Sequence, residues 1–386
     1  MATPAMLEGI RIADMSTVIF GPYATQILAD MGADVVKIEP PEGDRTRSIG
    51  RHAKTRGMGV LHLTINRGKR SVNWDVRSDK GRAAIRKLIE TSDVFIHNVR
   101  LDGVTRLGLD YESVRAIKPD IVYVHCTGFG QAGPYAPLAA YDDVIQASSG
   151  IASLLPRVTD DPAPRYLPMA IADKVSGMTA AYAVLGAIIH KLRTGEGQHV
   201  EVPMLESVAA FNLLEHMSGR TVEPRNGPMG YARQVDKERQ PFPTSDGYIS
   251  IAPYVDGNWV KLFTACGHGD ILLDERLTDP VLRFKNGSLL NERLRDITPE
   301  RTTAEWLDLC GGISVAAMRV NDLEELIDDP HLKAVDFLRL KQHPTEGGYY
   351  EVRPPVNFSA RPDPEIGPAP LLGEHSDALL RELGAE

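Results

Sequence analysis

Cysteine is scarce in this 386-residue sequence, which contains only Cys126, Cys266 and Cys310. They lie far apart, and none belongs to a CxxC pair or to a Cys/His spacing that would hold a zinc ion. We therefore predict no metal site. So few cysteines also fit a reducing compartment, where disulfides are rare.

The sequence also lacks an excess of basic residues and a long apolar run. Its formal net charge of -9 argues against a nucleic-acid-binding protein, which usually carries a basic patch. The N-terminal residues MATPAMLEGIRI do not contain the basic segment and apolar run of a signal peptide. The longest apolar run, residues 180–189, is shorter than the roughly 18 residues that span a bilayer. We expect a cytoplasmic protein without nucleic-acid or membrane partners.

Glycine is sparse where a dinucleotide-binding protein would need it. The turn after the first predicted strand, STVIFGP, has a single glycine. The GxGxxG fingerprint uses three glycines so that the backbone can approach a pyrophosphate closely. This turn therefore argues against an NAD or FAD site.

What the N-terminal half does contain is a regular alternation of strand and helix patterns. Strands are predicted at 10–15, 33–39, 93–98 and 120–129, and helices at 23–32, 81–92 and 111–119. A strand, a helix and a second strand at this spacing form a βαβ unit with parallel strands. The pattern predicts a doubly wound α/β domain. From about residue 231 a strand and shorter helices indicate a smaller second domain.

Basic residues gather in two places. The segment 65–82 contains Arg67, Lys69, Arg70, Arg77, Lys80 and Arg82. Such a run is either a solvated charged loop or a surface that binds a phosphate group. The second group, Arg100 and Arg106, follows the strand predicted at 93–98, and ligands of open α/β sheets bind beyond the carboxyl ends of strands. Its placement favours a role in phosphate binding.

Asp173 stands at the head of an apolar helix that includes residues 180–189. As an N-cap, its carboxylate would accept hydrogen bonds from free helix N–H groups. As a nucleophile, it would be kept ionised by the helix terminus and made more reactive by the loss of water. The pattern does not separate these interpretations. His97, His125 and His190 lie in or beside apolar segments and are expected to be structural.

Seven segments resemble those of a known family in both order and spacing. They are GPYATQILADMGADVVKIEPPEGDRTR, NRGKRSVNWD, DVFIHNVRLDGVTRLGLDY, TGFGQAGPY, YDDVIQASSG, RTGEGQHVEVPM and APLLGEHSDALLRELG. Together they resemble the class III CoA-transferases of the CaiB/BaiF type. The wider superfamily includes formyl-CoA transferase and α-methylacyl-CoA racemase.

The resemblance implies that Asp173 is a nucleophile. In such transferases the aspartate attacks the thioester of an acyl-CoA donor, giving a mixed anhydride and then an aspartyl-CoA thioester. An acyl-CoA and a carboxylic acid are then the substrates, and no tightly bound cofactor is implied. The residues implied to contact CoA are Val18, Ile19, Trp74, Arg77, Asn98, Val99, Arg100, Arg106, Tyr141 and Asp142.

The resemblance further implies a Rossmann-like large domain with a smaller α+β domain inserted into it. The large domain would comprise residues 1–204 and a C-terminal return at 336–386. A linker helix at 205–230 and a linker at 313–335 would flank the small domain at 231–312. Members of the family form interlocked homodimers, and we expect one here.

Two alternatives to a transferase stay open. A racemase of the same superfamily would need a histidine acid/base at the position of Tyr141. A phenol with a pKa of about 10 is a poor proton shuttle at neutral pH, which favours the transferase. A non-catalytic CoA-binding protein would use Asp173 only as a helix cap.

Overall fold

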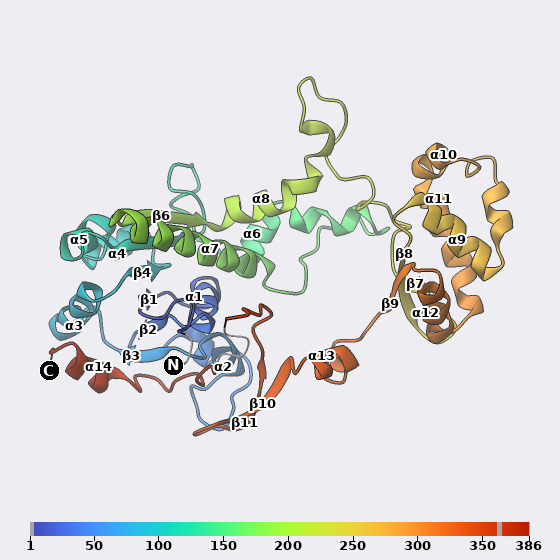
Figure 1. Cartoon of the computed structure of the whole chain (residues 1–386). Coiled ribbons are helices and arrows are strands. Elements are labelled where there is room, and N and C mark those ends of the chain that lie inside the picture. The colour runs from blue at the N-terminus through green and yellow to red at the C-terminus, as the bar shows by residue number, and fades with distance from the viewer. Residues whose placement is uncertain (1–3, 361–364, 386) are drawn as a thin grey trace. The chain divides into compact units, whose positions relative to one another are not determined.

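A computed structural model describes residues 4–360 and 365–385, and the chain divides into two compact units (Figure 1). Unit 1 comprises residues 1–151, 166–212 and 331–386, as far as these are described. Unit 2 comprises residues 152–165 and 213–330.

Unit 1 is built on a parallel sheet of six strands in the order β3-β2-β1-β4-β5-β6. The strands are β1 (Arg11–Met15), β2 (Asp34–Glu39), β3 (Arg70–Asn73), β4 (Val94–His97), β5 (Val122–Thr127) and β6 (Gln198–Pro203). The chain winds away from β1 in one direction and then, from β4, in the other. In such a sheet a crevice opens beyond the carboxyl ends of the two strands where the direction changes.

Helices cover both faces of this sheet, because successive side chains of a strand point to opposite sides. Ile12 of β1 packs in the layer of α1 (Phe20–Asp30), α7 (Ile171–Thr194) and α8 (Met204–His216). Ala13 packs in the layer of α3 (Asp79–Glu90), α4 (Leu101–Arg106), α5 (Tyr111–Ile117) and α14 (Ser376–Glu382). The predicted doubly wound α/β fold is confirmed.

Helix α7 is the one helix among the described residues that is long and apolar enough to cross a membrane by length and composition. In unit 1 it packs instead against α1 and the sheet, with Ala172, Ala180 and Val184 fully buried. It ends at Gly195, whose φ of 77° is a conformation that glycine adopts without strain. One face of α7 therefore packs in the core of unit 1.

The first part of the segment 65–82 is not a solvated loop, because it contains the largely buried strand β3, whereas Arg77, Lys80 and Arg82 are exposed. Arg67 forms an ion pair with Asp30 at 2.7 Å, and Lys69 forms one with Asp14 at 3.4 Å. The side chains of Arg67 and Lys69 are almost completely buried. Because Arg67 and Lys69 neutralise acids of the protein itself, the interpretation of this segment as a phosphate-binding surface is wrong for these two residues.

Unit 2 contains an antiparallel sheet of β7 (Phe242–Pro243), β8 (Tyr248–Ala252) and β9 (Ala316–Arg319). Unit 2 also contains the helices α9 (Asp256–Cys266), α10 (Pro280–Lys285), α11 (Gly287–Ile297) and α12 (Thr303–Gly312). The hydrophobic core of unit 2 includes the buried Trp306 and Phe263. Strand β9 lies in the segment expected to be a linker. Its ladder with β8 makes it part of the sheet.

The remaining helices and strands are short. They are α2 (Val60–Ile65), α6 (Asp142–Ser148), α13 (Pro330–Ala334) and the antiparallel hairpin of β10 (Leu338–His343) and β11 (Gly347–Val352). After the hairpin the chain returns to the sheet of unit 1, where α14 packs beside β3.

Candidate active site

A cavity of about 1340 Å³ opens in unit 1 beyond the carboxyl ends of β1, β4 and β5. Its walls come from the turns after these strands, from residues 40–45 after β2, and from the first residues of α6 and α7. The cavity therefore lies at the crevice that the strand order predicts.

Asp173 lines this cavity from the first turn of α7, three positions after the N-cap residue Ala170. It is not the helix cap that was one of the two expectations. No N–H or O–H group of the described residues donates to its carboxylate. The side chain is half-buried and is left without a polar partner in unit 1.

Asp142 performs the capping that was expected of Asp173. Its Oδ1 accepts a hydrogen bond from the backbone N–H of Asp173 at 3.0 Å. Its Oδ2 accepts one from Nε2 of Gln146 at 2.6 Å. The Gln146 side chain also accepts from the N–H of Leu167 and donates to the carbonyl of Met169. Helix α6 thus holds the start of α7 in place.

Burial raises the pKa of Asp173 to about 7, and the negative charge of Asp142 adds to the rise. The helix terminus was expected to keep Asp173 ionised, whereas its surroundings in the structure raise the pKa of this carboxyl. A carboxylate with so little solvation is a stronger nucleophile than one in water.

Val18, in the turn after β1, has a left-handed backbone with φ of 68°. This conformation is strained for a β-branched residue, and such strain persists only where neighbours enforce it. The N–H of Val18 donates to both oxygens of Asp44, at 3.3 and 3.2 Å. The neighbouring N–H of Thr17 donates to Oδ1 of Asn98 at 3.0 Å, which ties the turns after β1 and β4 together.

Lys37 and Asp44 form a buried ion pair beneath this turn, with Nζ 2.8 Å from Oδ2. Nζ also donates to the carbonyl of Ser16 at 3.0 Å. Both side chains are inaccessible to solvent, and the charge of Lys37 lowers the pKa of Asp44. Sequence reasoning missed both residues. The available signal was a lysine inside the buried strand DVVKIE.

Arg100 and Arg106 lie in the turn after β4 and in α4, and both line the cavity. Each is mostly exposed and lies near Asp102, at 3.6 and 3.5 Å. Because Asp102 is one acid near two guanidinium groups, these three side chains together carry a net positive charge. The backbone before them is fixed by His97, whose Nδ1 accepts the N–H of Val99 at 3.2 Å.

The structure brings most of the predicted site residues together and leaves three apart. The cavity is lined by Val18, Asn98, Val99, Arg100, Arg106, Tyr141, Asp142 and Asp173. Ile19, Trp74 and Arg77 do not line it. Trp74 is buried in the layer of α3, and Arg77 is exposed and pairs with Asp75 at 3.0 Å.

The described residues contain no group of three or more His, Cys, Asp or Glu side chains placed to hold a metal ion. The three cysteines are buried free thiols.

Residues 7–376 match the model of the family described as CoA-transferase family III. The chain belongs to this family. This family III CoA-transferase is therefore an enzyme.

Curated relatives with CoA-transferase names match this chain over nearly its full length. Our CoA-transferase is 35% identical to the succinate–glutarate CoA-transferase of Agrobacterium fabrum, over 98% of this chain and 95% of the relative. It is 31% identical to the human succinyl-CoA:glutarate CoA-transferase, over 98% of this chain and 86% of the relative. A crystal structure of a CaiB/BaiF family protein from Brucella suis matches with a TM-score of 0.83 and 33% identity, covering 98% of this chain and 100% of that chain.

Proposed function

We propose that this enzyme transfers CoA between an acyl-CoA and a carboxylic acid through covalent intermediates on Asp173. The observation that supports the proposal most strongly is the state of this carboxylate. It lines the large cavity of unit 1 and has no hydrogen-bond partner, whereas its own backbone is held by Asp142. A side chain that capped its helix would have to give up those hydrogen bonds in order to react.

In the first half-reaction, an oxygen of Asp173 attacks the thioester carbon of the donor. The carbon–sulfur bond breaks and its electron pair stays on sulfur, which leaves a mixed anhydride and CoA thiolate. The thiolate then attacks the aspartyl carbon of the anhydride. The donor acid departs as a carboxylate, and the aspartyl-CoA thioester remains.

In the second half-reaction, the acceptor carboxylate attacks the aspartyl carbon of this thioester and expels CoA thiolate. The thiolate attacks the acceptor carbon of the new anhydride, which forms the product thioester and restores the carboxylate of Asp173. No proton is consumed and no group is oxidised. Partial burial of Asp173 leaves its anionic form poorly solvated, which favours its attack on the thioester.

CoA would lie along the cavity, with its negatively charged phosphates near Arg100 and Arg106. These two exposed guanidinium groups share a single nearby acid, Asp102. Guanidinium groups bind phosphate through charge-assisted hydrogen bonds. The turns at Val18 and Asn98–Val99 would contact the pantetheine arm, and Tyr141 would lie beside the acyl group.

A dicarboxylic acid is the substrate class that we propose. The two curated relatives described above are named for succinate and glutarate, which are dicarboxylic acids of four and five carbons. We expect succinyl-CoA as a donor and glutarate as an acceptor in a first assay. The cytoplasmic location stays a prediction.

The test is to incubate the enzyme with succinyl-CoA, quench with hydroxylamine and locate the modified residue by mass spectrometry. Asp173 is expected to carry the modification, and Asp173→Ala is expected to lower transfer by on the order of 10³-fold or more. Asp143→Ala is the matched control, because Asp143 is an exposed residue of α6 that does not line the cavity. Normal transfer by Asp173→Ala would contradict the proposal.

A further inference from the structure

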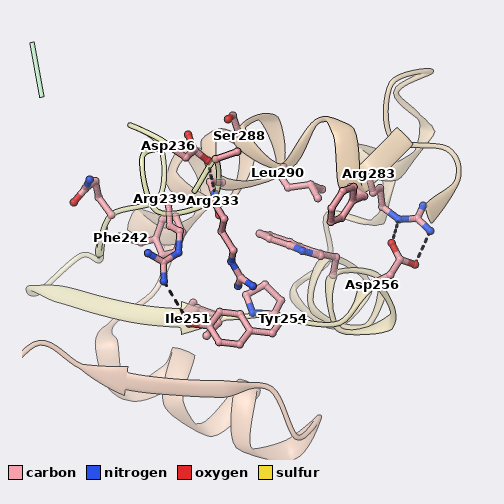
Figure 2. A pocket seen from close by; sticks show the side chains of 18 of the residues that line it. Arg233, Asp236, Arg239, Phe242, Ile251, Tyr254, Asp256, Arg283, Ser288 and Leu290 are labelled. Carbon is pink, nitrogen blue, oxygen red and sulfur yellow. Dashed lines mark hydrogen bonds and ion pairs between the residues drawn. The ribbon is translucent and has the colours of Figure 1, made fainter. Parts of the chain in front are cut away.

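Unit 2 has a cavity of its own, with a volume of about 580 Å³ (Figure 2). Its walls come from residues 231–242, from β8 and the turn that follows it, and from α9, α10 and α11. Every residue that lines it belongs to unit 2. A volume of this size is in the range of small-molecule sites.

Two arginine side chains reach toward Tyr254 in this cavity, as Figure 2 shows. The Cζ of Arg233 lies 3.8 Å from the centroid of the Tyr254 ring. Arg239 donates to Oε1 of Gln234 at 2.8 Å and to the Tyr254 hydroxyl at 3.5 Å. Neither arginine forms an ion pair with any described acid. Tyr254 therefore contacts one guanidinium group through its ring and the other through its hydroxyl.

The acids that line the cavity do not neutralise these arginines. Both oxygens of Asp256 accept hydrogen bonds from Arg283, at 2.6 and 2.8 Å. Asp236 accepts hydrogen bonds from the side chain of Asn291 and from the backbone N–H of Glu238. With four basic and two acidic side chains in its lining, the cavity carries a net positive charge that an anion would neutralise.

The lining also includes apolar and aromatic side chains. Phe242, Ile251 and Leu290 are buried in the core of unit 2, and Trp259 packs at its edge, stacked on Phe263. An inorganic anion would leave this apolar wall uncovered. A hydrocarbon segment between two acidic groups would cover the wall and also satisfy both guanidinium groups.

We propose that this cavity binds a dicarboxylate with a hydrocarbon backbone, with Arg233 and Arg239 contacting its carboxylates and Trp259 its methylene groups. Its lining shares no residue with that of the cavity at Asp173. Binding is expected without any CoA compound and does not depend on the chemistry proposed for Asp173.

Trp259 offers a local measure of binding, because it is the one tryptophan that lines the cavity. Trp74 lies in unit 1 and Trp306 is buried in the core of unit 2. The experiment is a titration of the full-length enzyme with glutarate, followed by tryptophan fluorescence, without CoA. A saturable change is expected, and Trp259→Phe is expected to abolish it.

Arg233→Gln and Arg239→Gln are each expected to weaken glutarate binding about ten-fold or more, since each removes a charge-assisted contact. Arg225→Gln is the matched control, an exposed arginine of unit 2 that does not line the cavity. Thermal unfolding of each variant checks that it is folded. Butyrate and inorganic phosphate are expected to bind at least ten-fold more weakly than glutarate.

The proposal is wrong if glutarate leaves the fluorescence unchanged, or if both arginine variants bind as tightly as the wild type. Equal affinity for phosphate would also overturn it, because the apolar wall would then contribute nothing. Transfer activity is measured in parallel. An active enzyme without the fluorescence change contradicts this inference alone, whereas binding in an enzyme without transfer activity contradicts only the proposed function.

Discussion

At the scale of single residues, the division of tasks between Asp142 and Asp173 is the main feature of the site in unit 1. Asp142 accepts the hydrogen bond from the first turn of α7, and Asp173 keeps its carboxylate free. The sequence placed both residues in the site through family resemblance. It did not reveal which one caps the helix, because they are 31 positions apart and their contact depends on how α6 and α7 pack.

The raised pKa of Asp173 leads to a prediction about pH. Only the carboxylate attacks a thioester, so kcat/KM for transfer should rise with pH and level off above about 7. Asp142→Asn removes the nearby negative charge that helps to raise this pKa. The pKa of Asp173 should then fall, and the acidic limb of the profile should move to lower pH.

The measurement is kcat/KM against pH for the wild type, Asp142→Asn and Asp143→Asn. Asp143 is exposed and belongs to the same helix, so its variant should keep the wild-type profile. If the acidic limb of the kcat/KM profile lies at the same pH in Asp142→Asn and in the wild type, Asp142 does not influence the ionisation of Asp173.

At the scale of elements, the sequence predicted the strands whose residues are uninterrupted and apolar, such as β4 and β5. It did not predict β3, because the residues of this strand, RSVN, are mostly polar and follow a basic run. The basic run that contains Lys69 was interpreted as either a solvated loop or a phosphate-binding surface, and Lys37 was not singled out. Only the folded structure brings these two lysines to Asp14 and Asp44. The sequence indicates where a buried strand lies, but charge pairs between strands depend on tertiary packing.

The Lys37–Asp44 pair supports the strained turn at Val18, and its loss should be costly. Asp44→Ala removes the ion-pair partner of the buried Lys37 and also the acceptor for the N–H of Val18. Breaking one side of a buried pair typically costs about 3–5 kcal/mol. We expect a loss of this size in the free energy of unfolding, measured by urea denaturation.

The double variant Lys37→Met/Asp44→Ala should be more stable than the sum of the two single losses predicts, because no unpaired charge stays buried. Glu90→Ala is the control, since Glu90 forms an exposed pair with Lys87 at 2.9 Å and should cost under about 1 kcal/mol. Additive losses in the double variant would mean that the two side chains act independently.

At the scale of the whole molecule, the long helices leave large apolar side chains in solvent. Helix α8 buries Val208 but exposes Phe211 and Leu214, which lie three residues apart and so share a face. The exposed fractions are 56% and 86%. Helix α7 likewise exposes Tyr182, Ile189 and Leu192. Apolar faces of this kind usually mark an interface.

These faces agree with the homodimer that the family resemblance implies, and we propose a second copy of this chain as their partner. In light scattering after gel filtration, the protein should have a mass about twice that of the 42.3 kDa chain. Leu214→Glu places a charge on the exposed face of α8 and should shift the mass toward the monomer on dilution. Lys80→Glu changes an exposed residue of α3 and should leave it unchanged. A wild-type protein that is monomeric at micromolar concentration would refute the dimer, and these apolar side chains would then need another partner.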